Sequence, residues 1–256
     1  MDDKHYNATY LEDTEKLLIG LKKASYGFLQ NLEAGPILEL GCGTGSDALQ
    51  LAQFLGDQYH MTGVDHDPSL LAHGREAAIQ AGIQNLDFME GSAENLPFEE
   101  NHFQGIRAER LIQHLPNPAQ VFKEIHRTLK EDGKVVLVET DWSGLTVYNS
   151  DLKTERKFVD FLTHKQVNFG LASREIGLLL HNQGFRNIQW VVKPFVIHQL
   201  EAANKYIMFD KMLMSATNEG FLTEDERSRY LELCQQLDNK DLFACSMSMV
   251  TYQADK

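Results

Sequence analysis

The sequence ILELGCGTG, at residues 37–45, contains the pattern that decides the fold. It begins with an apolar run typical of a buried strand and ends in a turn with glycines at alternate positions. The next residues, 46–56, have apolar side chains at helical spacing and a glycine at their end, which predicts a helix. A glycine-rich turn that joins a strand to a helix is a typical place for a nucleotide-like ligand to bind.

Strands and helices alternate along the first half of the chain. Strand-like runs cover residues 36–41, 59–65, 86–92, 102–109 and 134–140, and helical patterns cover residues 46–56, 67–82 and 117–133. Helices between strands form crossovers between parallel strands, so the pattern predicts an α/β fold: a doubly wound, Rossmann-like, mostly parallel sheet. In such sheets ligands bind at the carboxyl ends of the strands.

The second half of the chain has a different pattern. Two strand-like runs, 188–197 and 242–254, enclose a helical stretch at 200–238. This arrangement predicts an antiparallel last strand and a helical lid inserted before it. The expected organisation is one domain over residues 1–256, made of an N-terminal helical segment (1–32), a cofactor-binding core (33–197), a lid insertion (198–240) and the last strand (241–256).

The composition is that of a globular protein with an acidic charge balance. Lys and Arg number 24 against 37 Asp and Glu, which gives a formal net charge of −13. No run of Lys or Arg forms a basic face, so nucleic acid is not an expected partner. The three cysteines match no metal motif, no apolar run reaches the ~18 residues of a membrane span, and the acidic N-terminus does not resemble a secretion signal. We therefore expect a cytoplasmic protein without a metal or a membrane partner, with a homodimer as an open alternative to a monomer.

The glycine turn departs from the two common phosphate-binding motifs. It lacks the G-x-G-x-x-G spacing of dinucleotide sites and the Lys of the Walker motif. Glu39 would repel a pyrophosphate and attract an ammonium or sulfonium group. Asp65, which ends the next strand, would accept the hydroxyls of a ribose, and the polar turn within 91–103 would meet an adenine. These features favour S-adenosylmethionine as the ligand over a nicotinamide dinucleotide or a turn without a ligand.

Six motifs occur in the order of a known family. They are ILELGCGTG, GVDHDPSLL, GSAENLPFEENHF, IQHLPNP, VFKEIHRTLKEDGKVVLVETDW and REIGLLLHNQGF, and they lie within a stretch of about residues 36 to 197. By these motifs the chain resembles the class I S-adenosylmethionine-dependent methyltransferases, and most closely the small-molecule branch of ubiquinone/menaquinone-type methyltransferases. The resemblance implies methyl transfer from S-adenosylmethionine to a small molecule, with S-adenosylhomocysteine as the product. It does not identify the acceptor, because the fold serves many substrates.

The resemblance also implies roles for individual residues around the cofactor. Those expected to bind it are Glu39, Gly41, Cys42, Gly43 and Gly45 around the methionine part and ribose, Asp65 at the ribose hydroxyls, His66 beside the adenine, Ser92, Ala93 and Glu94 at the adenine edge, and Glu109 and Arg110 on the methionine side. The charged sequence RAER departs from the family, which often has an aromatic or small apolar residue near position 110. We expect Arg107 or Arg110 to hold the cofactor carboxylate or to reach an acidic substrate.

Residues for the acceptor come from other segments. Asp141 follows the fifth strand, where its carboxylate would orient an acceptor, and His114 lies near the cofactor edge as a candidate base. The aromatic side chains expected at the substrate are Tyr6, Tyr10, Trp142, Tyr206 and Phe209. Each of these also has a packing or structural interpretation. Two functional alternatives stay open: a methyltransferase fold that binds the cofactor without turnover, and a protein or RNA methyltransferase.

Overall fold

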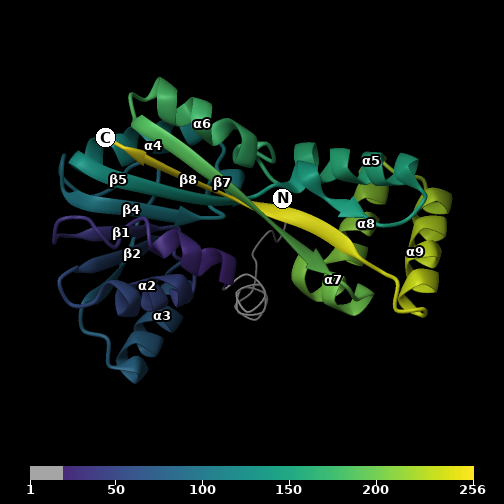
Figure 1. The fold of residues 1–256 in the computed structure, drawn as a ribbon, viewed down its shortest axis with the longest axis horizontal. Coiled ribbons are helices and arrows are strands. Elements are labelled where there is room, and N and C mark those ends of the chain that lie inside the picture. Colours follow the sequence, from purple (N-terminus) through teal and green to yellow (C-terminus); the bar gives the residue numbers. More distant parts are fainter. Residues whose placement is uncertain (1–19) are drawn as a thin grey trace. The chain divides into compact units, whose positions relative to one another are not determined.

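The computed structural model describes residues 20–256, and these divide into two compact units (Figure 1). The first, here called the sheet unit, comprises the described residues 20–139, 175–191 and 251–256. The second, here called the helical unit, comprises residues 140–174 and 192–250. Among the described residues, no helix combines the length and the apolar character that a membrane span requires.

The strands of the described residues form one sheet. They are β1 (Ile37–Leu40), β2 (Met61–Asp65), β3 (Leu86–Glu90), β4 (Phe103–Glu109), β5 (Leu129–Thr140), β6 (Thr146–Val147), β7 (Arg186–Ile197) and β8 (Cys245–Asp255). Their order is β3-β2-β1-β4-β5-β8-β6, and β7 pairs with β8. The strands from β1 to β5 pair in parallel, so the predicted doubly wound α/β sheet is confirmed.

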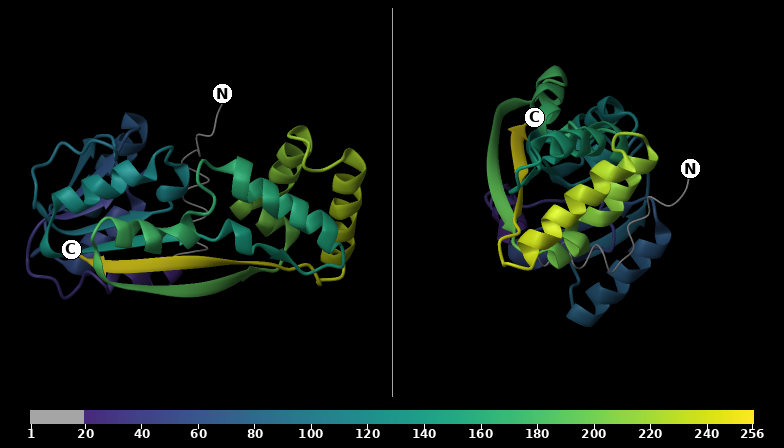
Figure 2. Two further views of the ribbon diagram at one scale, coloured as in Figure 1. Left: turned by 90° about the horizontal axis from the view of Figure 1, so that it is seen from above. Right: turned by 90° about the vertical axis from the view of Figure 1, so that its right-hand side faces the viewer.

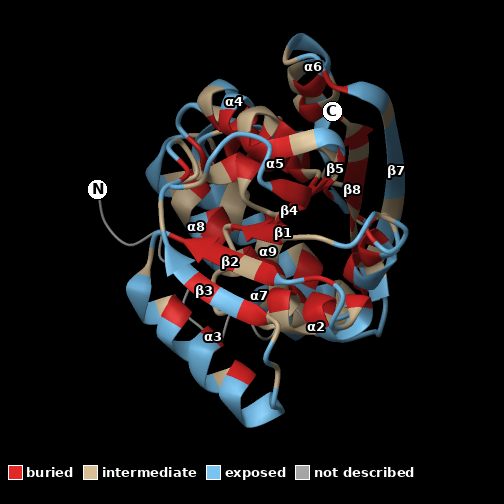
Figure 3. Cartoon of the chain, turned by 90° about the vertical axis from the view of Figure 1, so that its left-hand side faces the viewer, coloured by how far each residue is buried: buried red, intermediate tan, exposed pale blue. Residues whose placement is uncertain are grey.

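Strand order reverses between β1 and β4. In the central strand β1, Leu38 pairs with Thr62 of β2 on one side and with Ile106 of β4 on the other. The chain therefore builds the sheet outward from β1 in one direction and then returns to add β4 and β5 in the other. The carboxyl ends of β1 and β4 frame the switch point, where open parallel sheets bind ligands. Figure 3 shows that these central strands are buried.

The last strands run antiparallel, as the sequence predicts. Asn187 of β7 donates to Asp255 of β8 at 2.9 Å, and Gln253 donates to Gln189 at 2.7 Å. The residue numbers rise along one strand while they fall along the other, which defines an antiparallel pair. β8 also pairs antiparallel with β6. Figure 2 shows β7 and β8 as two long strands side by side.

The helices agree with the sequence pattern in number and order along the first half of the chain. The α-helices that lie wholly within the described residues are α2 (Ser46–Leu55), α3 (Pro68–Ala81), α4 (Pro118–Thr128), α5 (Leu152–Phe161), α6 (Ala172–Asn182), α7 (Leu200–Ile207), α8 (Phe209–Asn218) and α9 (Glu224–Asp238). The side chain of Asp67 caps α3 by accepting the backbone N–H of Ser69 at 2.8 Å. Gly82 ends that helix with φ 68°, a conformation that favours glycine.

One helix is shorter than its pattern indicates. The prediction of a helix over 117–133 is wrong beyond Thr128, where α4 ends. Leu129 is already extended and pairs with Phe103, while the next pair along the two strands joins Gly105 to Lys134. Residues between these pairs bulge out of β5, so the strand begins before the glycine that the pattern takes as the helix stop.

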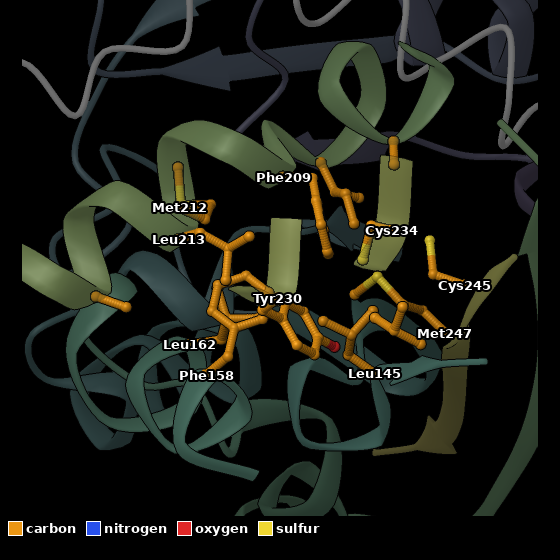
Figure 4. Close-up of a cluster of buried hydrophobic side chains, with 14 of the residues drawn as sticks. Leu145, Phe158, Leu162, Phe209, Met212, Leu213, Tyr230, Cys234, Cys245 and Met247 are labelled. Carbon is orange, nitrogen blue, oxygen red and sulfur yellow. The ribbon is translucent and has the colours of Figure 1, made fainter. Parts of the chain in front are cut away.

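The helical unit is larger than the predicted insertion. Helices α7, α8 and α9 occupy the stretch where helices are expected, but α5 belongs to the same unit. Figure 4 shows why the segments cohere: Phe158 of α5 and Phe209 of α8 meet edge to face, with ring centroids 5.6 Å apart. Tyr230 of α9 lies 6.4 Å from Phe209, centroid to centroid. One apolar core therefore joins helices that are distant in sequence.

Candidate functional site

The glycine turn after β1 is held in a backbone conformation that needs glycine. Gly41, Gly43 and Gly45 have φ values of 70°, 53° and 77°, all in the left-handed region. The turn is tied to the end of β2, because the N–H of Gly41 donates to Val64 O at 2.7 Å and the N–H of Cys42 donates to the same oxygen at 3.0 Å. The alternating glycines thus produce a rigid backbone cradle at the switch point.

Phe88 of β3 explains why glycines cluster around this turn. A Cβ atom at Gly45 would lie 2.5 Å from the Phe88 ring, and one at Gly74 of α3 would lie 2.9 Å from it. A Cβ at Gly63 of β2 would lie 2.8 Å from the same ring. Three segments therefore approach one aromatic side chain closely. Sequence reasoning missed this role of Phe88, since nothing in a linear pattern relates the four positions.

Asp65 connects the cradle to the end of β2. One carboxylate oxygen accepts the N–H of Gly43 at 2.8 Å, and the other accepts the N–H of Asp67 at 3.0 Å. His66 Nδ1 lies 3.3 Å from the second oxygen, and its side chain is exposed. Each carboxylate oxygen has two lone pairs, so both keep an acceptor position for a further donor. Two adjacent hydroxyls of a ribose fit this arrangement.

The turn after β3 is fixed by α4. Arg127 of α4 donates to Phe98 O at 2.7 Å and to Leu96 O at 3.0 Å, and Glu124 accepts the N–H of Leu96 at 2.8 Å. Within the turn, the Ser92 hydroxyl accepts the N–H of Glu94 at 3.2 Å, with Ala93 between them. Gly91 donates to Asp65 O at 2.9 Å, which joins this turn to the end of β2. The predicted adenine edge and the predicted ribose acid are therefore neighbours.

Glu39 lies beneath the cradle, but its charge is not free. Its side chain is 2% exposed and forms an ion pair with Arg107 of β4, which is 0% exposed. The Arg107 guanidinium also donates to Ser25 Oγ at 3.1 Å and lies over the Tyr26 ring, 5.1 Å from its centroid. Burial raises the pKa of Glu39 to about 8, while the positive charge of Arg107 acts in the opposite direction.

Two expectations from the sequence are corrected by this ion pair. Glu39 does not present an open negative charge to a sulfonium, because Arg107 neutralises it. Arg107 does not hold a cofactor carboxylate or reach an acidic substrate, because its side chain is completely buried. The pair is a structural element of the sheet unit. The features that support a bound ligand are the backbone cradle and Asp65.

A second ion-pair network lies where β4 ends. Lys22, from the helical segment 20–26, lies 2.9 Å from Asp47 of α2 and 2.8 Å from Glu109. Arg110 Nε donates to the other oxygen of Glu109 at 2.8 Å, and Arg110 itself has φ 50°. Tyr26 donates to Asp47 at 2.8 Å. Sequence reasoning missed Lys22 and Asp47, although Lys22 and Tyr26 are four residues apart and so share a helix face.

The segment that contains this geometry is similar to known proteins. The model of a family described as "Methyltransferase domain" matches residues 37–133, which contain the cradle, Asp65 and the turn after β3. Residues 37–133 are therefore similar to a methyltransferase domain.

The chain spans only part of the length of the curated relatives that it matches. An uncharacterised 37.1 kDa protein in transposon TN4556 of Streptomyces fradiae is 29% identical over 210 residues, 80% of this chain and 59% of that protein. The ubiquinone/menaquinone biosynthesis C-methyltransferase of Brucella canis is 38% identical over 103 residues, 40% of this chain and 38% of the relative. Phosphoethanolamine N-methyltransferase 2 of Haemonchus contortus, solved with S-adenosyl-L-methionine, has TM-score 0.63 at 18% identity, over 100% of this chain and 58% of that one. The last likeness shows the fold alone.

The two candidate catalytic residues have different surroundings. His114 ends a short 3-10 turn, Ile112–His114, in the sheet unit, and its Nε2 lies 3.1 Å from Gln113 Nε2. Asp141, in the helical unit, accepts from Ser143 Oγ at 2.6 Å and from Ser173 Oγ at 3.2 Å, and Arg174 approaches it at 3.4 Å. Asp141 is thus held by groups on Ser143, Ser173 and Arg174.

The predicted substrate aromatics fall into three groups. Trp142 and Phe209 belong to the apolar core of the helical unit, and Phe209 is completely buried there, so its role in this structure is packing. Tyr206 is partly buried, and Lys205 Nζ lies 5.8 Å from its ring centroid. Tyr6 and Tyr10 lie outside the described residues. Tyr206 is therefore the member of the set whose side chain is described and only partly covered.

Proposed function

We propose that the chain transfers the methyl group of S-adenosylmethionine to a small-molecule acceptor. The observation that supports this most is the cradle of three left-handed glycines with the Asp65 carboxylate held against it. The cradle presents backbone to a ligand that approaches closely, and Asp65 provides acceptors for a diol. The matched domain model covers both features. S-Adenosylmethionine supplies an activated methyl group, so the protein's task is alignment and exclusion of water.

The residues of the sheet unit would hold the cofactor in the following way. Gly41, Cys42, Gly43 and Gly45 would surround the methionine part, Asp65 would accept the ribose hydroxyls, and His66, Ser92, Ala93 and Glu94 would lie at the adenine. Glu109, which forms ion pairs with Lys22 and Arg110, would face the amino group of the methionine part. Arg110 would balance the carboxylate of the methionine part. Glu39 would act indirectly, by keeping Arg107 and β4 in place under the cradle.

We propose that residues of the helical unit contact the acceptor. Asp141, held by Ser143 and Ser173, would orient a hydroxyl or an amine of the acceptor. Tyr206, whose side chain is only partly covered, would contribute apolar surface. In the sheet unit, His114 is the candidate base. Relatives named for menaquinone and ubiquinone biosynthesis support an apolar, aromatic acceptor as the first class to screen.

Calorimetric titration of S-adenosylmethionine into the full chain and two variants tests the cofactor assignment. Asp65→Ala removes acceptors for two hydroxyls, and at about 1–2 kcal/mol for each hydrogen bond we expect affinity to fall on the order of 100-fold. Asp87→Ala is the matched control, because Asp87 is an exposed acid on the next strand that pairs with His60. Equal affinities of the two variants would contradict the ribose assignment.

Turnover is tested separately from binding. Acceptor-dependent formation of S-adenosylhomocysteine, in a screen of aromatic metabolites scored by mass gain, would establish an enzyme. A protein that binds the cofactor with no product from any acceptor would instead favour the alternative of a binding protein without turnover.

A further inference from the structure

Seven charged side chains lie together where β1, β4 and β5 end, and four of them, Lys22, Glu39, Arg107 and Glu139, are buried. We call them the strand-end cluster, and they are the carboxylates Glu39, Asp47, Glu109 and Glu139 and the cations Lys22, Arg107 and Arg110. Four carboxylates against three cations leave one negative charge in excess when all seven groups are ionised. A buried excess charge is costly, so a proton or a bound cation is expected to balance it.

Glu139 is the carboxylate of this cluster that has no ion pair among the described residues. The other three each lie against a cation: Glu39 against Arg107, Asp47 against Lys22, and Glu109 against both Lys22 and Arg110. Glu139 Oε1 accepts the backbone N–H of Ile112 at 2.6 Å and that of Gln113 at 3.4 Å. Its Oε2 is buried and has no hydrogen-bond partner within residues 20–256. Among the carboxyls of this cluster whose pKa is raised, Glu139 is therefore the candidate for the balancing proton that has no cation of its own among the described residues.

The register of the sheet places Glu139 at the ligand-binding edge. Leu40 pairs with Ala108, and Glu109 pairs with Val138. Gly41 therefore follows the last residue of β1 that pairs with β4, and Glu139 follows the last residue of β5 that pairs with β4. Sequence reasoning did not single out Glu139, because inside the apolar run KVVLVET it looks like the last residue of a strand.

The charged groups around Glu139 can be named. Burial raises the pKa of Glu139 to about 8, and the negative charge of Glu109 acts in the same direction. The backbone N–H groups of Ile112 and Gln113 and the positive charge of Arg110 lower the pKa. Gln113 lies between Glu139 and His114. Asp141, two residues along the chain, is already held by Ser143, Ser173 and Arg174. Within the described part of the chain, Glu139 thus has no ion pair with a cation.

We propose that Glu139 matches its charge to that of the bound ligand, and so makes the site prefer the sulfonium donor to the neutral thioether product. Glu139 is protonated when the site is empty or holds the product, and ionised when the donor is bound. Its proton passes to solvent on donor binding, and no other bond changes. This inference rests on the proposed function, since it concerns the same cofactor site.

The test is calorimetric titration of S-adenosylmethionine and of S-adenosylhomocysteine into the full chain at pH 6, 7, 8 and 9. The α-amino group, which titrates near pH 7.7–8, is common to both ligands, so the ratio of their dissociation constants isolates the sulfonium charge. We expect this ratio to shift toward the donor on the order of tenfold or more between pH 6 and pH 9. Repeating the titrations in buffers of different ionisation enthalpy should show more protons released by the donor than by the product.

Two variants make the test specific. Glu139→Gln is permanently neutral and keeps an oxygen for Ile112, so we expect a ratio that stays at its low-pH value and no excess proton release. Glu155→Gln is the matched control in the helical unit, because Glu155 is a buried carboxyl whose pKa is raised by burial and which accepts a backbone N–H, that of Val147, at 2.7 Å. This control should behave as the unmodified chain does.

The possible failures are distinguishable. A ratio that does not change with pH in the unmodified chain overturns the inference and leaves the proposed function intact; this measurement stands alone if Glu139→Gln does not fold. A ratio that still rises with pH in Glu139→Gln also overturns it. If neither ligand binds the unmodified chain, the proposed function fails and the inference fails with it.

Discussion

Replacing Arg107 with methionine should strongly destabilise the sheet unit. The substitution would leave the Glu39 carboxylate buried, at 2% exposed, without the cation that neutralises it. Removing one member of a buried pair typically costs about 3–5 kcal/mol, because the remaining charge stays in a poorly solvated site. At roughly 2–4 °C per kcal/mol for a chain of this size, the midpoint of thermal unfolding should fall by about 6–20 °C.

Removing both charges should restore most of this loss. In Glu39→Leu/Arg107→Met no buried charge is left unpaired, and apolar replacement of a buried ion pair is often close to neutral. Denaturation followed by circular dichroism would compare the unmodified chain, both single variants and the double variant. Hydrogen exchange of the β1 and β4 amides would assign the change to the sheet unit. We expect the double variant to be more stable than Arg107→Met by at least about 2 kcal/mol.

Two results would refute this reasoning. If the double variant loses as much stability as the two single variants together, the charges do not depend on each other. If instead the double variant is folded but binds S-adenosylmethionine more weakly by on the order of tenfold or more, Glu39 acts on the donor itself, as the sequence alone suggested.

Three further predictions concern single positions. Gly45→Ala should lower the free energy of unfolding by about 2–4 kcal/mol and weaken cofactor binding, because it adds a strained left-handed residue to a Cβ contact of 2.5 Å with Phe88. The control Gly82→Ala, with φ 68° and no atom within 4 Å of the added Cβ, should lower it by only about 1 kcal/mol. Equal losses of stability in urea denaturation would contradict the role of Phe88. Phe209→Ala should destabilise the helical unit by about 3–5 kcal/mol and leave the affinity for S-adenosylmethionine unchanged. A variant of normal stability that had lost only its affinity for the acceptor would show instead that Phe209 binds substrate. The folded-state pKa of Glu139, about 8, lies above the unfolded value of about 4.3, so the native state binds more protons between them and its stability falls as pH rises through this window. Glu139→Gln should therefore gain stability relative to the unmodified chain by up to a few kcal/mol from pH 5 to pH 8, and a constant difference in urea midpoints would contradict the shift.

The order of the elements could be read from the sequence because each depends on local chemistry. The Asp67 cap, the glycine that ends α3 and the alternation of strands with helices all act over a few residues. The end of α4 could not be read in this way, because Leu129 leaves the helix to pair with Phe103, a contact across the sheet. The extent of the helical unit was missed for the same reason, since its core depends on Phe158 meeting Phe209.

The site was predicted in part. The glycine positions follow from a local requirement for positive φ, and Asp65 follows from its place at the end of a strand. The partner of Glu39 could not be inferred, because Arg107 is 68 residues away and reaches it only through strand pairing. Glu139 was missed because its proposed role depends on the absence of an ion pair within residues 20–256, and a sequence shows neither ion pairs nor their absence.

The central claim is that the cradle and Asp65 bind S-adenosylmethionine rather than a phosphate-bearing dinucleotide. Calorimetric titration of the purified chain with S-adenosylmethionine and, separately, with NAD tests this most directly. The structure predicts one S-adenosylmethionine bound per chain and no heat of binding with NAD. Binding of NAD with no response to S-adenosylmethionine would contradict the claim.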